Sequence, residues 1–141
     1  MNIPRAIIQS TVSEILETMY FMSPAYSGEG LRDSDLLDVA VDFSGDRRGR
    51  FRMQVTRRLA TGMTMEFLVC EQDGINPDQV EATVKELANV ACGAAMSAWM
   101  PTANFDYELP CLLADLPEIQ GHTFAVASGI AEIAFRVDLA G

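Results

Sequence analysis

Apolar residues recur every three or four positions near the start of the chain, which is the spacing of one buried helix face. The positions that carry this pattern are Ile8, Val12, Ile15, Met19 and Met22. The pattern predicts a helix that begins at about residue 4 or residue 10 and ends at about residue 22, where Ser23 and Pro24 follow. The glycine-rich residues around Gly28 are expected to form a loop.

Apolar and polar residues then alternate, which is typical of half-buried strands. Residues 36–43 (LLDVAVDF) and residues 50–55 (RFRMQV) alternate in this way, and SGDRRG between them is predicted to be a turn. The arginines of the second segment fall on its polar positions, so they are expected on the solvent face of a strand. A further turn at residues 60–62 leads into residues 63–70 (MTMEFLVC), which we predict as a third strand.

A second helix has a complete start signal. Asn76 is a favoured N-cap residue, Pro77 suits the first helical position, and Gln79 can complete a capping box. We expect this helix to continue to residue 99 or residue 100, where Pro101 stops it. Three more strand-like segments follow, at residues 104–116, 121–129 and 130–139.

The order of elements repeats itself along the chain. A helix and three strands are followed by another helix and three strands, and residues 11–19 (TVSEILETM) resemble residues 83–91 (TVKELANVA). We therefore predict an α+β fold of two pseudo-repeats, about 1–72 and 73–141, in a single domain that covers residues 1–141. Two long helices would pack on one face of a mixed or antiparallel sheet.

The overall composition is that of an ordinary globular domain. Hydrophobic residues make up 49% and charged residues 21% of the 141 residues, and no apolar run reaches the roughly 20 residues needed to span a membrane. The net charge of -10 argues against binding to nucleic acid, whose phosphates it would repel. The first ten residues lack the long apolar core of a signal peptide. We expect a cytoplasmic protein with neither nucleic-acid nor membrane partners.

Residues that could bind a metal or act as a nucleophile are few. The cysteines Cys70, Cys92 and Cys111 form no CxxC pair and lie in apolar segments, so buried, reduced thiols are expected. The one histidine, His122, has no nearby Cys or His to complete a zinc site, and one histidine is poor evidence for a Ser–His dyad. No metal site and no bound cofactor are therefore predicted for this chain.

The candidate chemistry lies on the second helix. A helical wheel at about 100° per residue predicts one core stripe. This stripe contains Val80, Val84, Leu87, Ala91, Ala94 and Ala98. The opposite face contains Ala82, Glu86, Asn89, Gly93 and Met100. Glu86 and Asn89 are thus predicted one turn apart on an outward ridge.

A helix surface that meets only water is the simplest interpretation of Glu86 and Asn89. Two features favour a surface that meets another molecule. Asn and Gly are poor helix formers, Gly costing about 1 kcal/mol relative to Ala, and the small residues Ala82 and Gly93 leave the backbone approachable. A carboxylate can pair with a cation and a carboxamide can orient a water molecule. The ridge could therefore complete an active site that a partner supplies.

The ridge residues resemble the CheX branch of the CheC/CheX/FliY phosphatases of bacterial chemotaxis. The family pattern is an Asp or Ser, three residues, Glu, two residues and Asn, with a Pro a little over twenty residues later. Glu86 and Asn89 match this pattern, and Pro110 follows Asn89 by 21 positions (110 − 89). The repeated plan of helix and strands also matches, and the resemblance covers essentially the whole chain.

The resemblance implies a phosphatase that acts on the phospho-aspartate of a CheY-like response regulator. Glu86 and Asn89 would be the catalytic residues: Glu86 would pair with the regulator's lysine, and Asn89 would orient the attacking water. The partner contacts would be made by Ala82, Lys85, Gly93 and Pro110. The regulator would supply the aspartyl phosphate and the Mg²⁺, and the protein would form a homodimer.

Two positions depart from the family pattern. Ala82 stands where the family has Asp or Ser, which would lower affinity or rate if that side chain matters. In the first repeat, Glu14 keeps the Glu position but Glu17 replaces Asn, and a carboxylate there would repel a phosphoryl group. One site per chain is therefore predicted.

Two other functions stay open at this point. Ala82 favours a non-catalytic CheX-like binding or scaffold module in two-component or flagellar-switch signalling. The third is an unrelated small-molecule binder or enzyme, in which some of the eight methionines would line a pocket.

Overall fold

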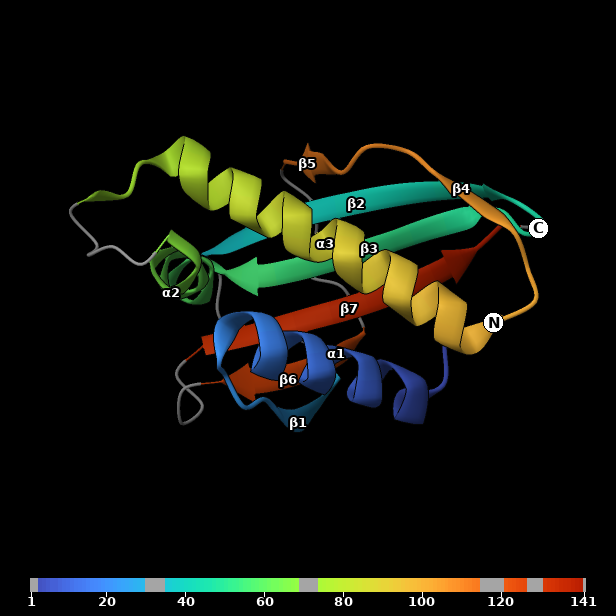
Figure 1. Cartoon of the computed structure of the whole chain (residues 1–141), viewed down its shortest axis with the longest axis horizontal. Coiled ribbons are helices and arrows are strands. Elements are labelled where there is room, and N and C mark those ends of the chain that lie inside the picture. Colours follow the sequence, from blue (N-terminus) through green and yellow to red (C-terminus); the bar gives the residue numbers. More distant parts are fainter. Residues whose placement is uncertain (1–2, 30–34, 69–73, 115–120, 127–130, 141) are drawn as a thin grey trace.

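The computed structural model describes residues 3–29, 35–68, 74–114, 121–126 and 131–140 (Figure 1). The helices are α1 (Arg5–Tyr20), α2 (Arg57–Leu68) and α3 (Pro77–Trp99). The strands are β1 (Ala25–Glu29), β2 (Leu36–Gly45), β3 (Gly49–Thr56), β4 (Phe105–Tyr107), β5 (Cys111–Leu113), β6 (His122–Val126) and β7 (Ala131–Leu139). Within these ranges, no helix combines the length and the hydropathy that a membrane span needs.

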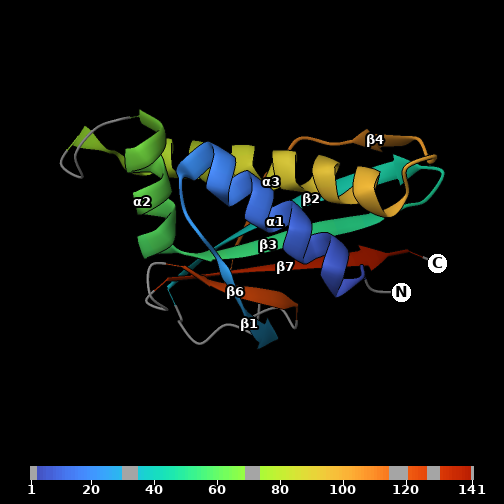
Figure 2. The same cartoon turned by 60° about the horizontal axis from the view of Figure 1, so that its bottom comes forward.

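The seven strands form one sheet in which every pair is antiparallel. The strand order is β1-β6-β7-β3-β2-β4, and β5 also pairs with β2. The long helices α1 and α3 lie on the same face of this sheet (Figure 2). The predicted α+β class, with two long helices packed on an antiparallel sheet, is confirmed.

The strand order follows the two predicted pseudo-repeats. β3 and β7 pair at the centre, β2 and β6 flank them, and each edge strand comes from the opposite half of the chain: β1 pairs with β6, while β4 and β5 pair with β2. Neither half completes its part of the sheet alone. The two repeats are therefore interleaved, and α1 and α3 hold equivalent places in them.

The segment predicted as a third strand is instead helix α2, so that prediction is wrong. Met63, Met65 and Phe67 alternate with polar residues, which suggested a strand. The buried positions follow helical spacing instead: Leu59, Ala60, Met63 and Thr64. Thr56 marks the start, because its hydroxyl oxygen accepts a hydrogen bond from the backbone N–H of Leu59 at 3.3 Å. The turn predicted at residues 60–62 lies within this helix, and residues 69–70 lie outside the described residues.

The segment around Gly28, predicted as a loop, is the edge strand β1. It pairs with β6, and its register shifts between Tyr26 and Gly28. Its pairing partner is supplied by the other repeat, so the local sequence carries little sign of the strand. The strand predicted at residues 104–116 is divided into β4 and β5, with Pro110 between them. Proline cannot donate to a strand ladder, which accounts for the break.

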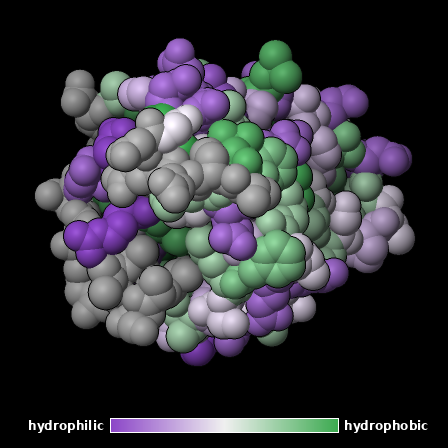
Figure 3. Space-filling view, turned by 60° about the vertical axis from the view of Figure 1, so that its left-hand side comes forward, coloured by the Kyte–Doolittle hydropathy of each residue, from purple (hydrophilic) through white to green (hydrophobic). Residues whose placement is uncertain are grey.

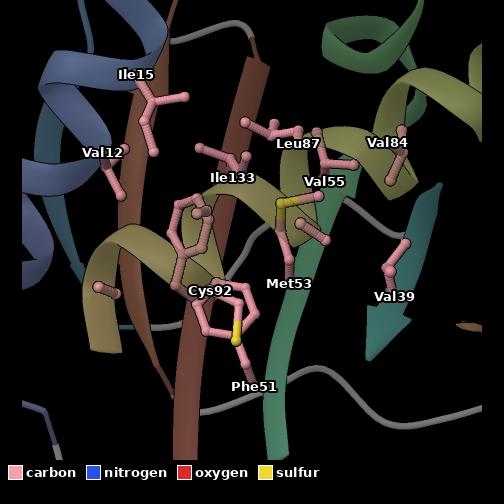
Figure 4. Close-up of a cluster of buried hydrophobic side chains, with 14 of the residues drawn as sticks. Val12, Ile15, Val39, Phe51, Met53, Val55, Val84, Leu87, Cys92 and Ile133 are labelled. Carbon is pink, nitrogen blue, oxygen red and sulfur yellow. The ribbon is translucent and has the colours of Figure 1, made fainter. Parts of the chain in front are cut away.

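The core lies between the helices and one face of the sheet (Figure 4). Val12 and Ile15 of α1 and Val84 and Leu87 of α3 lie over a layer of strand residues. This layer includes Val39, Phe51, Met53, Val55 and Ile133. Each of these side chains is buried, so the apolar faces of both long helices are used by the fold itself.

Two of the three cysteines lie in the described residues, and one of them is buried as predicted. Cys92 on α3 is 0% exposed, and burial raises the pKa of its thiol to about 12. Cys111 is exposed, contrary to the prediction, because it begins the short strand β5 at the rim of the sheet. Cys70 lies outside the described residues.

The other face of the sheet carries the alternating arginines and other polar residues, but it is only partly exposed to solvent, since Asp38 is 7% and Gln54 1% exposed. Arg50 donates to Asp42 on the neighbouring strand, with Nε and Oδ1 2.7 Å apart, and both side chains are nearly half exposed. Arg52 pairs with Asp38 at 2.6 Å in a more buried position. These arginines bind aspartates of their own sheet.

Candidate functional site

The predicted start of α3 is confirmed. The side-chain oxygen of Asn76 accepts a hydrogen bond from the backbone N–H of Gln79 at 2.9 Å, and the side-chain oxygen of Gln79 accepts one from the backbone N–H of Asn76 at 2.9 Å. Pro77 is the first helical residue. This capping box fixes where the helix begins, and hence which way each later side chain points.

The buried face of α3 follows two rows of residues that lie four positions apart. One row is Val80, Val84, Ala88, Cys92 and Met96, and the other is Thr83, Leu87, Ala91 and Ala95. Such a row winds around the helix, because four residues turn about 400° rather than 360°. Ala94 and Ala98, which were predicted in the core stripe, are exposed for this reason.

Glu86 and Asn89 lie on the opposite face and are exposed, as the helical wheel predicts. Ala82 is exposed one turn before Glu86, and Lys85 and Gly93 are half-buried along the same side. Among the described residues, neither Glu86 nor Asn89 makes a side-chain hydrogen bond or ion pair. The carboxylate and the amide are therefore available to another molecule.

Small residues extend this exposed face beyond the predicted ridge. Ala94, Ser97 and Ala98 are exposed, and a Cβ atom built on Gly93 would meet no atom within 4 Å. The exposed positions of the helix after Asn89 thus carry only small side chains and are accessible to another molecule. The helical wheel missed this extension because it treats the buried face as a straight stripe, whereas the buried rows wind around the helix axis.

Thr83 does not supply the polar side chain that position 82 lacks. It is buried, and its hydroxyl donates a hydrogen bond to the carbonyl oxygen of Gln79 at 3.0 Å. The exposed face therefore begins with the methyl group of Ala82.

Tyr20, at the end of α1, is a neighbour of Glu86 that the sequence did not suggest. Its side chain is 1% exposed, and burial, with a smaller contribution from the charge of Glu86, raises its pKa to about 12. Tyr20 and Glu86 also line the same small pocket, together with Ala82. The phenol remains protonated at neutral pH, so it borders Glu86 as a neutral group.

Pro110 lies on a separate segment from Glu86 and Asn89. It is half-buried and directly precedes β5. The strand that follows it, β5, contacts α3 (Figure 1).

The described residues contain no group of three or more His, Cys, Asp or Glu side chains that could hold a metal ion. His122 is engaged in the fold, since its Nε2 lies 3.2 Å from the carbonyl oxygen of Ile3 and its Nδ1 lies 3.4 Å from the hydroxyl of Tyr26. What the exposed face of α3 offers to another molecule is the carboxylate of Glu86 and the amide of Asn89.

Three of the eight methionines serve the core and give no support to the small-molecule hypothesis. Met53, Met63 and Met96 are each 0% exposed and belong to the core cluster. These three side chains fill space between the helices and the sheet, which is the usual role of buried methionine.

A comparison with protein families matches most of the chain. The model described as chemotaxis phosphatase CheX matches residues 38–133. A comparison with curated protein sequences found no match.

Solved CheX structures are similar over nearly the whole chain. CheX from Vibrio vulnificus superposes with a TM-score of 0.76 at 16% identity, covering 96% of this chain and 95% of that chain. CheX from Desulfovibrio desulfuricans gives 0.72 at 17% identity, covering 96% and 97%. The CheX-CheY-BeF3-Mg complex from Borrelia burgdorferi gives 0.72 at 15% identity, again covering 96% and 97%. At these identities the structural likeness establishes the fold.

Proposed function

The chain belongs to the CheX family of chemotaxis phosphatases, and we propose that it removes the phosphoryl group from the aspartyl phosphate of a CheY-like receiver domain. The observation that carries the proposal is the exposed pair Glu86 and Asn89, one turn apart on α3. The core accounts for the buried rows of this helix, but packing gives no reason for this pair.

In the proposed reaction, α3 enters the active site of the receiver and Asn89 orients the attacking water. A carboxamide can donate one hydrogen bond and accept another while staying neutral. It can therefore hold a water molecule in line with the phosphorus without repelling the phosphoryl oxygens. Positioning of this kind supplies much of the catalysis in phosphoryl transfer, where the protein has little covalent chemistry to perform.

Glu86 would pair with the lysine of the receiver. No cation of the described residues holds its carboxylate, so the charge is available when the receiver docks. The receiver would also bring the Mg²⁺, since the described part of this chain contains no cluster of ligands for it. The solved complex of CheX with CheY, BeF3 and Mg from Borrelia burgdorferi supports a partner of this kind.

The decay of receivers charged with acetyl phosphate tests the proposal. Each receiver domain encoded in the same genome would be mixed with the wild-type chain, and one of them should lose phosphate faster. Asn89→Ala should lower the accelerated rate at least about 100-fold, the usual effect of removing one positioned polar group. Glu86→Ala should lower it strongly as well.

A matched control for these variants lies on α1. Glu17 is exposed at the place in the first repeat that corresponds to Asn89, and Glu17→Ala should leave the rate unchanged. All three substitutions are at exposed positions, so thermal melting should stay close to that of the wild type. The proposal fails if wild type and Asn89→Ala give the same decay with every receiver.

One observation favours a second function, binding without catalysis. Ala82 is exposed where the family pattern has Asp or Ser, and the neighbouring Thr83 is buried and cannot take its place. Under this alternative, a receiver activated with BeF3 would bind the chain, but the wild type would not accelerate dephosphorylation. A gain of activity in Ala82→Asp would then show that the missing side chain had removed the catalysis.

The same proposal includes the assembly and the location of the protein. The receiver partner places the reaction in the cytoplasm, and the family resemblance implies a homodimer. Light scattering of the purified chain would measure a mass close to 15.4 kDa for a monomer and twice that mass for the proposed dimer.

A further inference from the structure

A small pocket lies beside the exposed pair, where the ends of three helices meet. Its walls include Tyr20 at the end of α1, Phe67 and Leu68 at the end of α2, and Ala82 and Glu86 on α3. Its volume is about 160 Å³. Figure 3 views the molecule from this end and shows apolar side chains gathered on part of the surface, with hydrophilic ones along part of their edge.

The apolar side chains at this pocket are exposed to an unusual degree. Phe67 is 56% exposed and Leu68 is 41% exposed. Phe21 does not line the pocket, but it directly follows Tyr20, which does, and it is 78% exposed. Its backbone adopts a φ of 54°, which glycine or asparagine would adopt at lower cost. Clustered apolar side chains on a surface that is otherwise polar mark a place where another molecule binds.

The pocket and the proposed active face share residues. Ala82 and Glu86 lie one helical turn apart on α3, and both line the pocket. A receiver that brings its phosphoryl group to Asn89 and its lysine to Glu86 must therefore cover the mouth of the pocket. The methyl group of Ala82 leaves this mouth open and apolar, whereas an aspartate or a serine would place a polar group there.

We propose that the pocket receives an apolar side chain of the receiver domain, and that this contact sets how the receiver seats on α3; the proposal rests on the proposed function. The volume is close to that of an apolar cavity that binds benzene, about 150 Å³, so it suits a branched aliphatic side chain or a phenyl ring. The partner is thus a receiver with an exposed Leu, Ile, Met or Phe next to its phosphorylation site. The apolar contact takes the place of the polar contact that an Asp or Ser at position 82 would make.

Ala82→Leu tests the proposal, because it fills the mouth of the pocket and leaves Asn89 unchanged. Position 82 is exposed on a helix, where leucine is well tolerated. With a receiver charged by acetyl phosphate, KM should rise at least about tenfold while kcat stays within about twofold, since the lost contact is made equally before and during the reaction. Phe67→Ala, which removes one wall, should also raise KM. Ala6→Leu, at an exposed alanine near the start of α1, is the matched control and should change neither constant.

The outcomes separate this inference from the proposed function. An unchanged KM in both Ala82→Leu and Phe67→Ala would overturn the role of the pocket. A fall in kcat at constant KM in Ala82→Leu would also overturn it, because the leucine would then affect Glu86 and not the docking of the receiver. If the wild type binds a BeF3-activated receiver without accelerating decay, the proposed phosphatase function fails. The Kd of Ala82→Leu, still expected to rise about tenfold, then tests the pocket alone. If the wild type binds no receiver, both proposals fail.

Discussion

Replacing Gly93 with alanine should have opposite effects on the free chain and on its proposed complex with a receiver. Gly93 lies inside α3, where a Cβ atom would meet no atom within 4 Å. Glycine in a helix interior costs about 0.5–1 kcal/mol relative to alanine. Because the added methyl group meets open space, Gly93→Ala should raise the free energy of unfolding by about 0.5–1 kcal/mol.

The same methyl group should weaken the complex. Gly93 lies one turn beyond Asn89 along the exposed side of the helix, so a receiver that reaches Asn89 would pass close to the backbone at Gly93. Forcing one extra methyl group into a packed contact costs about 1–3 kcal/mol. This cost corresponds to an affinity that is roughly 5- to 150-fold weaker.

Two measurements and one control decide between these effects. Urea denaturation gives the free energy of unfolding, and titration with a BeF3-activated receiver gives the affinity. Gly62→Ala in α2 is the control, because a Cβ atom there would meet only the Cε of Met22, at 3.9 Å. It should gain similar stability and keep the affinity of the wild type. Wild-type affinity in Gly93→Ala would refute the close approach of the partner, and a loss of stability would refute the helix argument.

Three further predictions concern the stability of α3 and the reactivity of the two described cysteines. Asn76→Ala removes the N-cap acceptor of α3 and should lower the free energy of unfolding by about 1 kcal/mol in urea denaturation. Leu87→Ala empties a position that is 1% exposed and should cost about 2–5 kcal/mol in the same assay. In a Cys70→Ser background, a thiol reagent at pH 8 should label Cys111 quickly and Cys92 only after unfolding, because the raised pKa of about 12 keeps the buried thiol protonated. Rapid labelling of both cysteines in the folded chain would contradict this expectation.

The parts of the fold that the sequence predicted correctly depend on local signals. The start of α3 depends on Asn76, Pro77 and Gln79, which lie side by side in the chain. Apolar and polar residues alternate along most of β2 and β3, and so both strands could be recognised from the sequence. β1 was missed because its partner β6 comes from the other repeat, and α2 was missed because a short run of alternating methionines fits either element. The errors fall where pairing or packing with distant residues decides the structure.

The candidate site was likewise predicted only in part from the sequence. The helical wheel places Glu86 and Asn89 on the exposed face from their spacing alone, and the fold agrees. Tyr20 and Phe67 could not be placed beside Glu86 from the sequence, because the ends of α1 and α2 reach α3 only in the folded chain. A helical wheel assumes that the buried face runs straight along the helix axis. The buried rows of α3 wind around the axis instead, and Ala98 was therefore assigned to the wrong face.

The two repeats are equivalent in the sheet but not on the surfaces of their long helices. Aligning Thr11 with Thr83 places Glu17 opposite Asn89 and Phe21 opposite Gly93. α1 ends at Tyr20, and Phe21 then stands 78% exposed where α3 continues as a low surface of small residues. The first repeat therefore differs from the second in two respects, since it lacks the amide and carries a bulky side chain in the path of an approaching partner. Covering the sheet requires both helices to keep their buried faces, whereas the proposed receiver site requires an exposed face with small residues on only one helix. The interleaved fold thus leaves the exposed surface of α1 free to change without loss of the proposed site on α3.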